Sequence, residues 1–225
     1  MAKKLSNNLS TKVIHEGNKP DGNFGAIIPP IYQTTTYVQS SPGEHKGYDY
    51  TRCGNPTRSR LEECLASAEQ GKFALTTASG LSAAMLVMHM LPNGSNVLCG
   101  DDVYGGTYRM LTNVFNDSHN INFIDTTNLV EVKEKITKFK PKLIWLETPT
   151  NPLLKISDIK KISKIAKQNK CLVVVDNTFM SPYFQNPLLL GADIVMHSLT
   201  KYINGHSDVI GGALILNNKK IYDKL

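Results

Sequence analysis

Apolar residues recur along this chain with two different spacings. From position 61 onward, apolar runs of strand length occur at 73–77, 96–99, 121–124, 143–146, 172–175, 194–196 and 213–216. Between these runs, apolar residues return at helical spacing at 61–68, 81–91, 106–115, 129–139 and 157–169. This alternation predicts an α/β fold, with a mostly parallel sheet covered by helices on both faces.

The first 60 residues have a different texture. They are rich in Gly, Pro, Asn and Thr and show little sustained periodicity, which is typical of an extended segment. We therefore expect an N-terminal arm at 1–60 and an α/β domain at 61–225. A further helical pattern begins near 221–225, so the domain is predicted to be incomplete at its C-terminal end.

Composition limits the classes of partner. Hydrophobic residues make up 41% of the chain and charged residues 20%, as in packed globular proteins. The net charge of +6 comes mostly from lysine, and the lysines at 155–170 alternate with isoleucines, as on the wet face of an amphipathic helix. A nucleic-acid surface more often brings arginine and aromatic residues together. We expect neither a nucleic-acid partner nor a membrane partner, because no segment approaches the length of a membrane span.

The cysteines and the start of the chain bear on location. Cys53, Cys64, Cys99 and Cys171 are far apart and show neither CxxC spacing nor a disulfide framework, which favours a reducing compartment. The polar, basic start at 1–12 argues against a secretory signal. The predicted location is the cytoplasm.

Two charged residues follow predicted strands. Asp176 comes directly after the apolar run 172–175, at the edge of an open α/β sheet where ligands bind. Lys201 follows 194–196, and a desolvated lysine is a candidate amine nucleophile. Ser198 and Lys201 also match the S-x-x-K pattern of penicillin-binding serine enzymes, but the Ser-Asp-Asn and Lys-Thr-Gly elements of those enzymes do not occur in this sequence.

Two turns complete the candidate chemistry. The small residues at 78–84 form a predicted strand-to-helix turn, whose free amides suit a phosphate, although tight helix–sheet packing would use the same residues. Hydroxyls of Ser198 and Thr200 and the guanidinium of Arg52 could add donors. In the turn 101–107, Tyr104 could stack on a planar group. The paired aspartates there lack further ligands at metal spacing, so no metal site is expected.

These segments resemble one family in both content and order. The motifs are 50–57 (YTRCGNPT), 78–81 (ASGL), 102–107 (DVYGGT), 147–152 (ETPTNP), 175–178 (VDNT), 198–202 (SLTKY) and 205–208 (GHSD). Across residues 10–225 the sequence resembles the Cys/Met-metabolism enzymes that depend on pyridoxal 5′-phosphate (PLP), the family that includes cystathionine γ-lyases and γ-synthases. The resemblance implies the aspartate-aminotransferase-like large domain of fold type I, preceded by an arm.

The resemblance also implies a role for each matching residue. Lys201 would hold PLP as a Schiff base and then move protons, Asp176 would pair with the pyridine nitrogen, and Tyr104 would stack on the ring. Gly80, Leu81, Ser198 and Thr200 would hold the phosphate, and Asn151 would hydrogen-bond near the ring hydroxyl and the substrate carboxylate. Tyr50 and Arg52 would reach the phosphate of a neighbouring subunit. A homo-oligomer follows, with sites shared in a dimer and a tetramer as the expected assembly.

The implied activity is that of a carbon–sulfur lyase in transsulfuration, which links methionine and cysteine metabolism. The expected reaction is cleavage of L-cystathionine to cysteine, 2-oxobutanoate and ammonia. Gly106 stands where methionine γ-lyases typically carry cysteine, which argues against that activity. The family's C-terminal domain and its substrate-binding arginine are missing from this sequence, so γ-replacement on an O-acyl-homoserine, or an inactive truncated subunit, stays an alternative.

Overall fold

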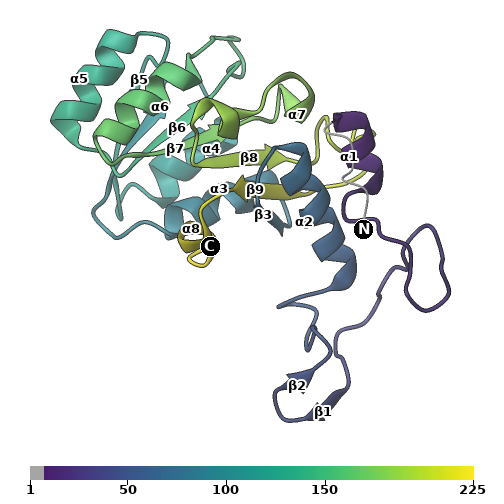
Figure 1. The fold of residues 1–225 in the computed structure, drawn as a ribbon. Coiled ribbons are helices and arrows are strands. Elements are labelled where there is room, and N and C mark those ends of the chain that lie inside the picture. Colours follow the sequence, from purple (N-terminus) through teal and green to yellow (C-terminus); the bar gives the residue numbers. More distant parts are fainter. Residues whose placement is uncertain (1–7) are drawn as a thin grey trace. The chain divides into compact units, whose positions relative to one another are not determined.

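The structure is a computed structural model that describes residues 8–225; residues 1–7, the start of the predicted arm, lie outside the described residues. The chain divides into two compact units, Met1–Ala68 and Glu69–Leu225 (Figure 1).

The first unit contains more regular structure than an extended arm. Its elements are α1 (Leu9–His15), the hairpin strands β1 (Gln39–Ser41) and β2 (Glu44–His45), and α2 (Pro56–Ala68). The texture of residues 1–60 gave no sign of these elements, because local caps supply what periodicity does not reveal. The Asn8 side chain accepts from the Ser10 amide, and Asn55 accepts from the Thr57 amide beside the helix-starting Pro56. Helix α2 crosses position 60, and the predicted arm boundary there stays a prediction.

The second unit is built on a seven-stranded sheet in the order β3-β9-β8-β7-β6-β4-β5. The strands are β3 (Phe73–Thr77), β4 (Asn96–Gly100), β5 (Asn120–Ile124), β6 (Leu143–Glu147), β7 (Leu172–Asp176), β8 (Ile194–Ser198) and β9 (Gly212–Leu216). The strands from β8 to β5 pair in parallel, whereas β9 runs antiparallel to both of its neighbours. The predicted, mostly parallel sheet is confirmed.

Helices cover both faces of this sheet (Figure 1). They are α3 (Gly80–His89), α4 (Gly105–Arg109), the π-helical turn η1 (Met110–Val114), α5 (Leu129–Phe139), α6 (Ile159–Gln168), α7 (Ser181–Phe184), the 3₁₀ turn η2 (Pro187–Leu190) and α8 (Lys219–Tyr222). Alternation along β6 supplies both cores: Trp145 packs in the cluster with α3, and Ile144 in the cluster with α5 and α6. The predicted helix at 106–115 widens at η1, which lets both Met110 and Phe115 be buried.

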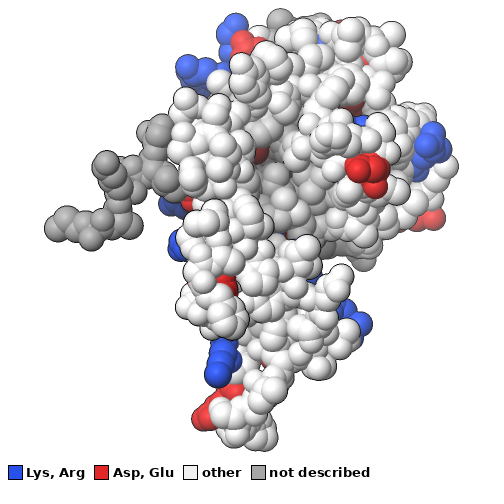
Figure 2. All heavy atoms as spheres, turned by 90° about the vertical axis from the view of Figure 1, so that its right-hand side faces the viewer, with Lys and Arg blue, Asp and Glu red and all other residues white. Residues whose placement is uncertain are grey.

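On the face drawn in Figure 2, Lys and Arg side chains form small separate patches among uncharged residues. None of the helices in residues 8–225 is both long enough and apolar enough to cross a lipid bilayer.

Candidate functional site

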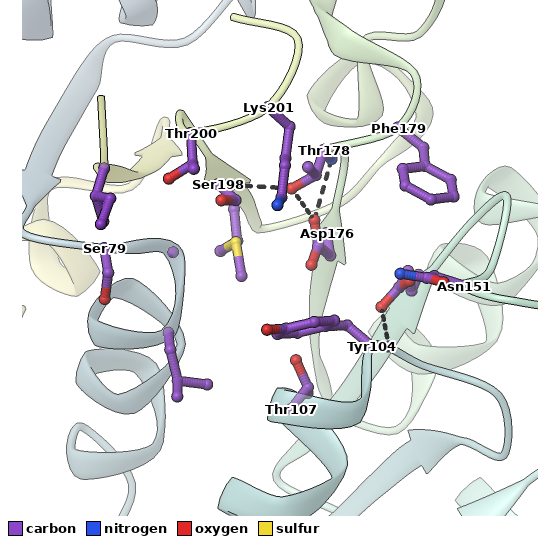
Figure 3. A pocket seen from close by; sticks show the side chains of 15 residues that line it. Ser79, Tyr104, Thr107, Asn151, Asp176, Thr178, Phe179, Ser198, Thr200 and Lys201 are labelled. Carbon is purple, nitrogen blue, oxygen red and sulfur yellow. Dashed lines mark hydrogen bonds between the residues drawn. The ribbon is translucent and has the colours of Figure 1, made fainter. Parts of the chain in front are cut away.

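A cavity of about 300 Å³ lies at the carboxyl end of the parallel strands (Figure 3). The strand ends β6, β7 and β8, the start of α3 and the β4–α4 turn all contribute to its wall. Eight residues singled out from the sequence line it: Gly80, Leu81, Tyr104, Asn151, Asp176, Ser198, Thr200 and Lys201. They come from separate segments because parallel strands present their carboxyl ends at one edge of a sheet.

The start of α3 packs directly against the end of β8. A Cβ added at Gly80 would lie 2.8 Å from the Ser198 Cβ, so only glycine permits this approach. Ser79 caps the helix by accepting from the Ser82 amide at 3.1 Å. The first amides of a helix have no partners within the helix, so those of Gly80 and Leu81 suit an anion in the cavity.

Thr178 links the Asp176 carboxyl to the end of β8. Its hydroxyl donates to Asp176 Oδ1 at 2.5 Å and accepts from the Ser198 amide at 2.9 Å. The Thr178 amide also donates to Asp176 Oδ1, at 3.0 Å. One oxygen of Asp176 is thus fixed from behind, which orients the carboxyl at the cavity wall.

Lys201 follows β8, and its side chain points into the cavity (Figure 3). The side chain is exposed in this structure, and its role as the amine nucleophile stays a prediction. It is exposed because it lies in the turn after β8, beyond the buried part of the strand. Thr200, one residue earlier, donates its hydroxyl to the Gly211 carbonyl at 3.4 Å and accepts from the Gly211 amide at 3.2 Å.

Tyr104 forms the opposite wall of the cavity (Figure 3). Its amide donates to Glu147 Oε2 at 2.9 Å, which ties the β4–α4 turn to the end of β6. A Cβ added at Gly106 would lie 2.3 Å from the Tyr104 ring, so glycine at 106 sets where the ring can lie.

Glu147 and Asp176 are neighbours in the sheet register and both are buried. Burial and the charge of Asp176 raise the pKa of Glu147 to about 8, against hydrogen bonds from backbone amides. Burial also raises the pKa of Asp176, while the two hydrogen bonds from Thr178 and the nearby His197 oppose the rise. The cavity therefore favours one negative charge in this pair over two.

The paired aspartates of the β4–α4 turn hold loops together. Asp101 pairs with Lys155 at 2.9 Å, and Asp102 accepts from the Thr150 hydroxyl and the Leu153 amide. Within residues 8–225, no group of three or more His, Cys, Asp or Glu is placed to hold a metal ion.

Tyr50 and Arg52 belong to the first unit, whereas the cavity belongs to the second. The Arg52 guanidinium lies over the Tyr50 ring, 4.8 Å from its centroid, so the two side chains form one cation–π pair.

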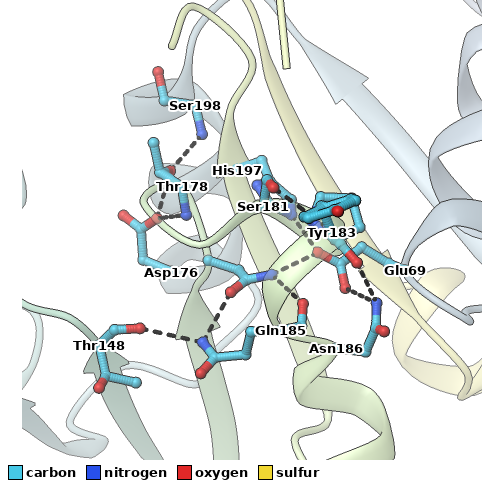
Figure 4. A network of polar contacts seen from close by, with 12 residues as sticks. Glu69, Thr148, Asp176, Thr178, Ser181, Tyr183, Gln185, Asn186, His197 and Ser198 are labelled. Carbon is cyan, nitrogen blue, oxygen red and sulfur yellow. Dashed lines mark hydrogen bonds and ion pairs between the residues drawn. The ribbon is translucent and has the colours of Figure 1, made fainter. Parts of the chain in front are cut away.

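A buried polar network lies behind the strand ends (Figure 4). At its centre, Nε2 of His197 donates to Glu69 Oε1 at 2.5 Å, and both side chains are 1% exposed. The Asn177 side-chain amide donates to the same oxygen at 2.7 Å. These contacts join the start of the unit to the residues that directly follow Asp176 and precede Ser198.

Gln185 extends the network to β6. Its side-chain amide donates to Asn177 Oδ1 at 2.9 Å and to the Thr148 carbonyl at 3.1 Å. The ends of β6, β7 and β8 are therefore held to one another by hydrogen bonds on the side away from the cavity.

The cavity fits a phosphorylated planar cofactor. Its phosphate would meet the free amides of Gly80 and Leu81, and Tyr104 offers an aromatic face. In addition, Thr107 Oγ1 lines the cavity, is buried and has no hydrogen-bond partner among residues 8–225, as expected of a wall that receives a polar group.

Sequence reasoning gave no role to Glu69, Glu147 or Thr178. Glu147 and Thr178 lay inside recognised motifs, at strand ends, and that position was the available signal. Glu69 carried no local signal, because its partner His197 lies 128 residues away.

Comparison with known proteins gives a consistent result. The family model of Cys/Met metabolism PLP-dependent enzymes matches residues 10–225. A probable cystathionine γ-synthase of Herpetosiphon aurantiacus is 51% identical over 218 residues, which are 96% of this chain and 68% of that protein. The cystathionine γ-lyase of Dictyostelium discoideum is 52% identical over 219 residues, which are 96% of this chain and 56% of that protein.

The crystal structure of metB from Corynebacterium glutamicum superimposes with a TM-score of 0.94 at 44% identity. The match covers 96% of this chain and 57% of that one. The chain thus spans little more than half the length of the Dictyostelium and Corynebacterium proteins.

Replacing Glu69 tests the buried network. In Glu69→Leu, His197 and Asn177 lose their shared acceptor inside the protein, so we expect unfolding free energy to fall by about 3–5 kcal/mol. Glu69→Gln keeps an acceptor oxygen and should lose less. Urea unfolding followed by circular dichroism measures both, with Glu134→Gln on exposed α5 as a control that keeps the native midpoint. An unchanged midpoint in Glu69→Leu would contradict the assigned role.

Proposed function

The chain belongs to the family of Cys/Met metabolism PLP-dependent enzymes, and on that premise we propose that it cleaves the Cγ–S bond of L-cystathionine. With water, the products are cysteine, 2-oxobutanoate and ammonia. The single observation that carries the proposal is the convergence of a lysine, a buried carboxyl, an aromatic ring and a helix N-terminus on one cavity. The γ-lyase relative favours elimination as the reaction, and Gly106 argues against methionine as the substrate.

The phosphate end of the cofactor would lie at the start of α3. There the amides of Gly80 and Leu81 donate to it, with the positive end of the helix dipole behind them. The Ser198 and Thr200 hydroxyls complete the set of donors. The close contact of Gly80 with Ser198 keeps the two halves of this cradle together.

The ring would lie between the Tyr104 face and the end of β7. Asp176 would accept a hydrogen bond from the pyridine nitrogen and keep it protonated, and Thr178 fixes the carboxyl in place for that contact. Asn151 contributes its side-chain amide near the ring hydroxyl and the substrate carboxylate. When bound, PLP supplies an electron sink that stabilises negative charge on the substrate's α-carbon.

Lys201 supplies the reacting amine. Its Nζ would hold the cofactor at its aldehyde carbon and, with substrate bound, would take the α-proton and return a proton to the substrate. Tyr104 borders the same space, so its hydroxyl would be able to donate a proton to the leaving sulfur. The exposed position of Lys201 leaves the amine free to move between these places.

Tyr50 and Arg52 would act in a second copy of the chain. Their cation–π pair presents one guanidinium and one phenol hydroxyl as a unit, which suits a phosphate. We propose a homo-oligomer with sites shared within a dimer, and a tetramer as the assembly. All four cysteines are free, which supports a location in the reducing cytoplasm.

A second function is favoured by the probable γ-synthase relative. In that reaction the cysteine sulfur would bond to Cγ of an O-acyl-homoserine in place of the acyloxy group, which leaves as a carboxylate, and the same residues would carry the shared early steps.

Binding of the cofactor is tested by absorption. Added PLP should give the chain a visible band, and borohydride should fix the cofactor to Lys201, as a labelled peptide identified by mass spectrometry. Lys201→Ala should lose the labelled peptide. Lys220→Ala, which changes an exposed lysine of α8, is the matched control and should keep it. Labelling spread over many lysines would contradict the assignment.

Product analysis separates the two reactions. With L-cystathionine we expect 2-oxobutanoate and cysteine in equal amounts, and with cysteine plus O-acyl-homoserine little cystathionine. Lys201→Ala should reduce product formation by at least about 10³-fold, because both the cofactor bond and the proton transfer are lost. Cystathionine formation in the second mixture, without 2-oxobutanoate in the first, would favour the γ-synthase.

Mixed variants test the shared sites. Lys201→Ala and Arg52→Ala should each be inactive alone, and an equal mixture that is unfolded and refolded should recover up to about a quarter of native activity. The recovery arises because about half of the dimers are hybrids, and each hybrid contains one site with both residues and one with neither. A mixture as inactive as the separate variants would count against sharing.

A further inference from the structure

Glu147 is a buried acid in the cavity, and the proposed reaction gives it no part. It ends β6, directly beside Asp176 at the end of β7 in the parallel register. The two residues are 6% and 7% exposed, and both line the cavity. Neighbouring strand ends lie about 4.8 Å apart, so two ionised carboxylates here would repel strongly in a medium poor in water.

The surroundings decide which of the two carries the proton. Asp176 accepts two hydrogen bonds from Thr178 that stabilise its charge, and His197 nearby also lowers its pKa. Glu147 accepts hydrogen bonds from the backbone amides of Tyr104 and Asn151, which lower its pKa. The negative charges of Asp176 and Asp102 raise it.

Among residues 8–225, no cationic side chain is among the groups that shift the pKa of Glu147. Lys201 shares the cavity but follows β8, two strands away from β6. Cys99 on the neighbouring strand β4 is a buried thiol whose pKa is raised by burial, so it stays neutral and adds no further negative charge. Burial and the charge of Asp176 accordingly raise the pKa of Glu147 to about 8, so at neutral pH it is the acid that keeps its proton.

We propose that Glu147 is a positioning residue, which as a neutral acid holds the Tyr104 amide, and with it the aromatic wall, opposite Asp176 without adding a second negative charge. The link with the cofactor rests on the proposed function, whereas the protonation of Glu147 does not. A neutral carboxyl can accept from Tyr104 and leave Asp176 as the single anion for the pyridine nitrogen. Ionisation would add a charge that repels the cofactor's phosphate.

Protonation of Glu147 in the folded chain makes the free energy of unfolding depend on pH in one direction. The pKa of Glu147 rises from 4.5 to about 8 on folding, so in this interval the folded chain holds a proton that the unfolded chain releases. Stability therefore falls as pH rises from about 4.5 to about 8 and changes no further above that for this group. Glu147→Gln mimics the neutral acid and removes this dependence.

The first test is unfolding of the cofactor-free chain at about pH 5, 7 and 9. As pH rises, the unfolding midpoint of the native chain should fall relative to that of Glu147→Gln, so the variant gains stability over the native chain from the lowest pH to the highest. In Asp176→Asn the loss of stability attributed to Glu147 should move to lower pH, because the neighbouring charge is gone. A constant difference between Glu147→Gln and native across these pH values would overturn the proposal.

The second test separates positioning from charge. Glu147→Gln keeps an oxygen for the Tyr104 amide and should bind PLP as the native chain does at neutral pH. Above about pH 8 the native chain should lose several-fold more affinity for PLP than the variant, because only the native side chain ionises. Glu147→Ala lacks the acceptor and should bind PLP at least about tenfold more weakly. Equal affinity in Glu147→Ala and native would refute positioning.

The two proposals can fail separately. If no variant and no native chain binds PLP, the proposed function fails, yet the pH dependence of unfolding still decides the protonation of Glu147. If PLP binds at Lys201 but the unfolding curves show no such dependence, only the role of Glu147 fails.

Discussion

The buried carboxyl of Glu69 is the contact on which the geometry of the cavity depends. It gathers donors from His197 on β8 and from Asn177 just after β7, and a buried carboxyl with fewer partners would be strongly unfavourable. Since Gln185 carries the network on to Thr148, three strand ends are held at fixed separations. The chemistry on the other side depends on those separations.

Backbone alternation explains how one set of strands serves both sides. His197 and Ser198 are consecutive and point to opposite faces, so the first enters the Glu69 network and the second lines the cavity. Asp176 and Asn177 divide in the same way at the end of β7. Asp176 and Ser198, which line the cavity, therefore each have a neighbour in sequence that is fixed from behind by hydrogen bonds.

Electrostatics decides where negative charge lies in the cavity. Two carboxyl groups end adjacent strands, and the one with the stronger donors, Asp176, is favoured as the anion. The raised pKa of Glu147 follows from burial and from this neighbour rather than from any property of its own segment. A helix N-terminus at Gly80 provides the opposite, positive end of the site.

The sequence by itself determined the strand and helix pattern of residues 61–225 and eight residues of the cavity, because periodicity and strand-end motifs are local properties. It missed α1 and the hairpin, which depend on caps and turns, and the π turn, which depends on burying both Met110 and Phe115. Only the tertiary structure paired Glu69 with His197 and set Glu147 beside Asp176. Those pairings join distant segments, and the protonation of a buried acid depends on neighbours that sequence order does not reveal.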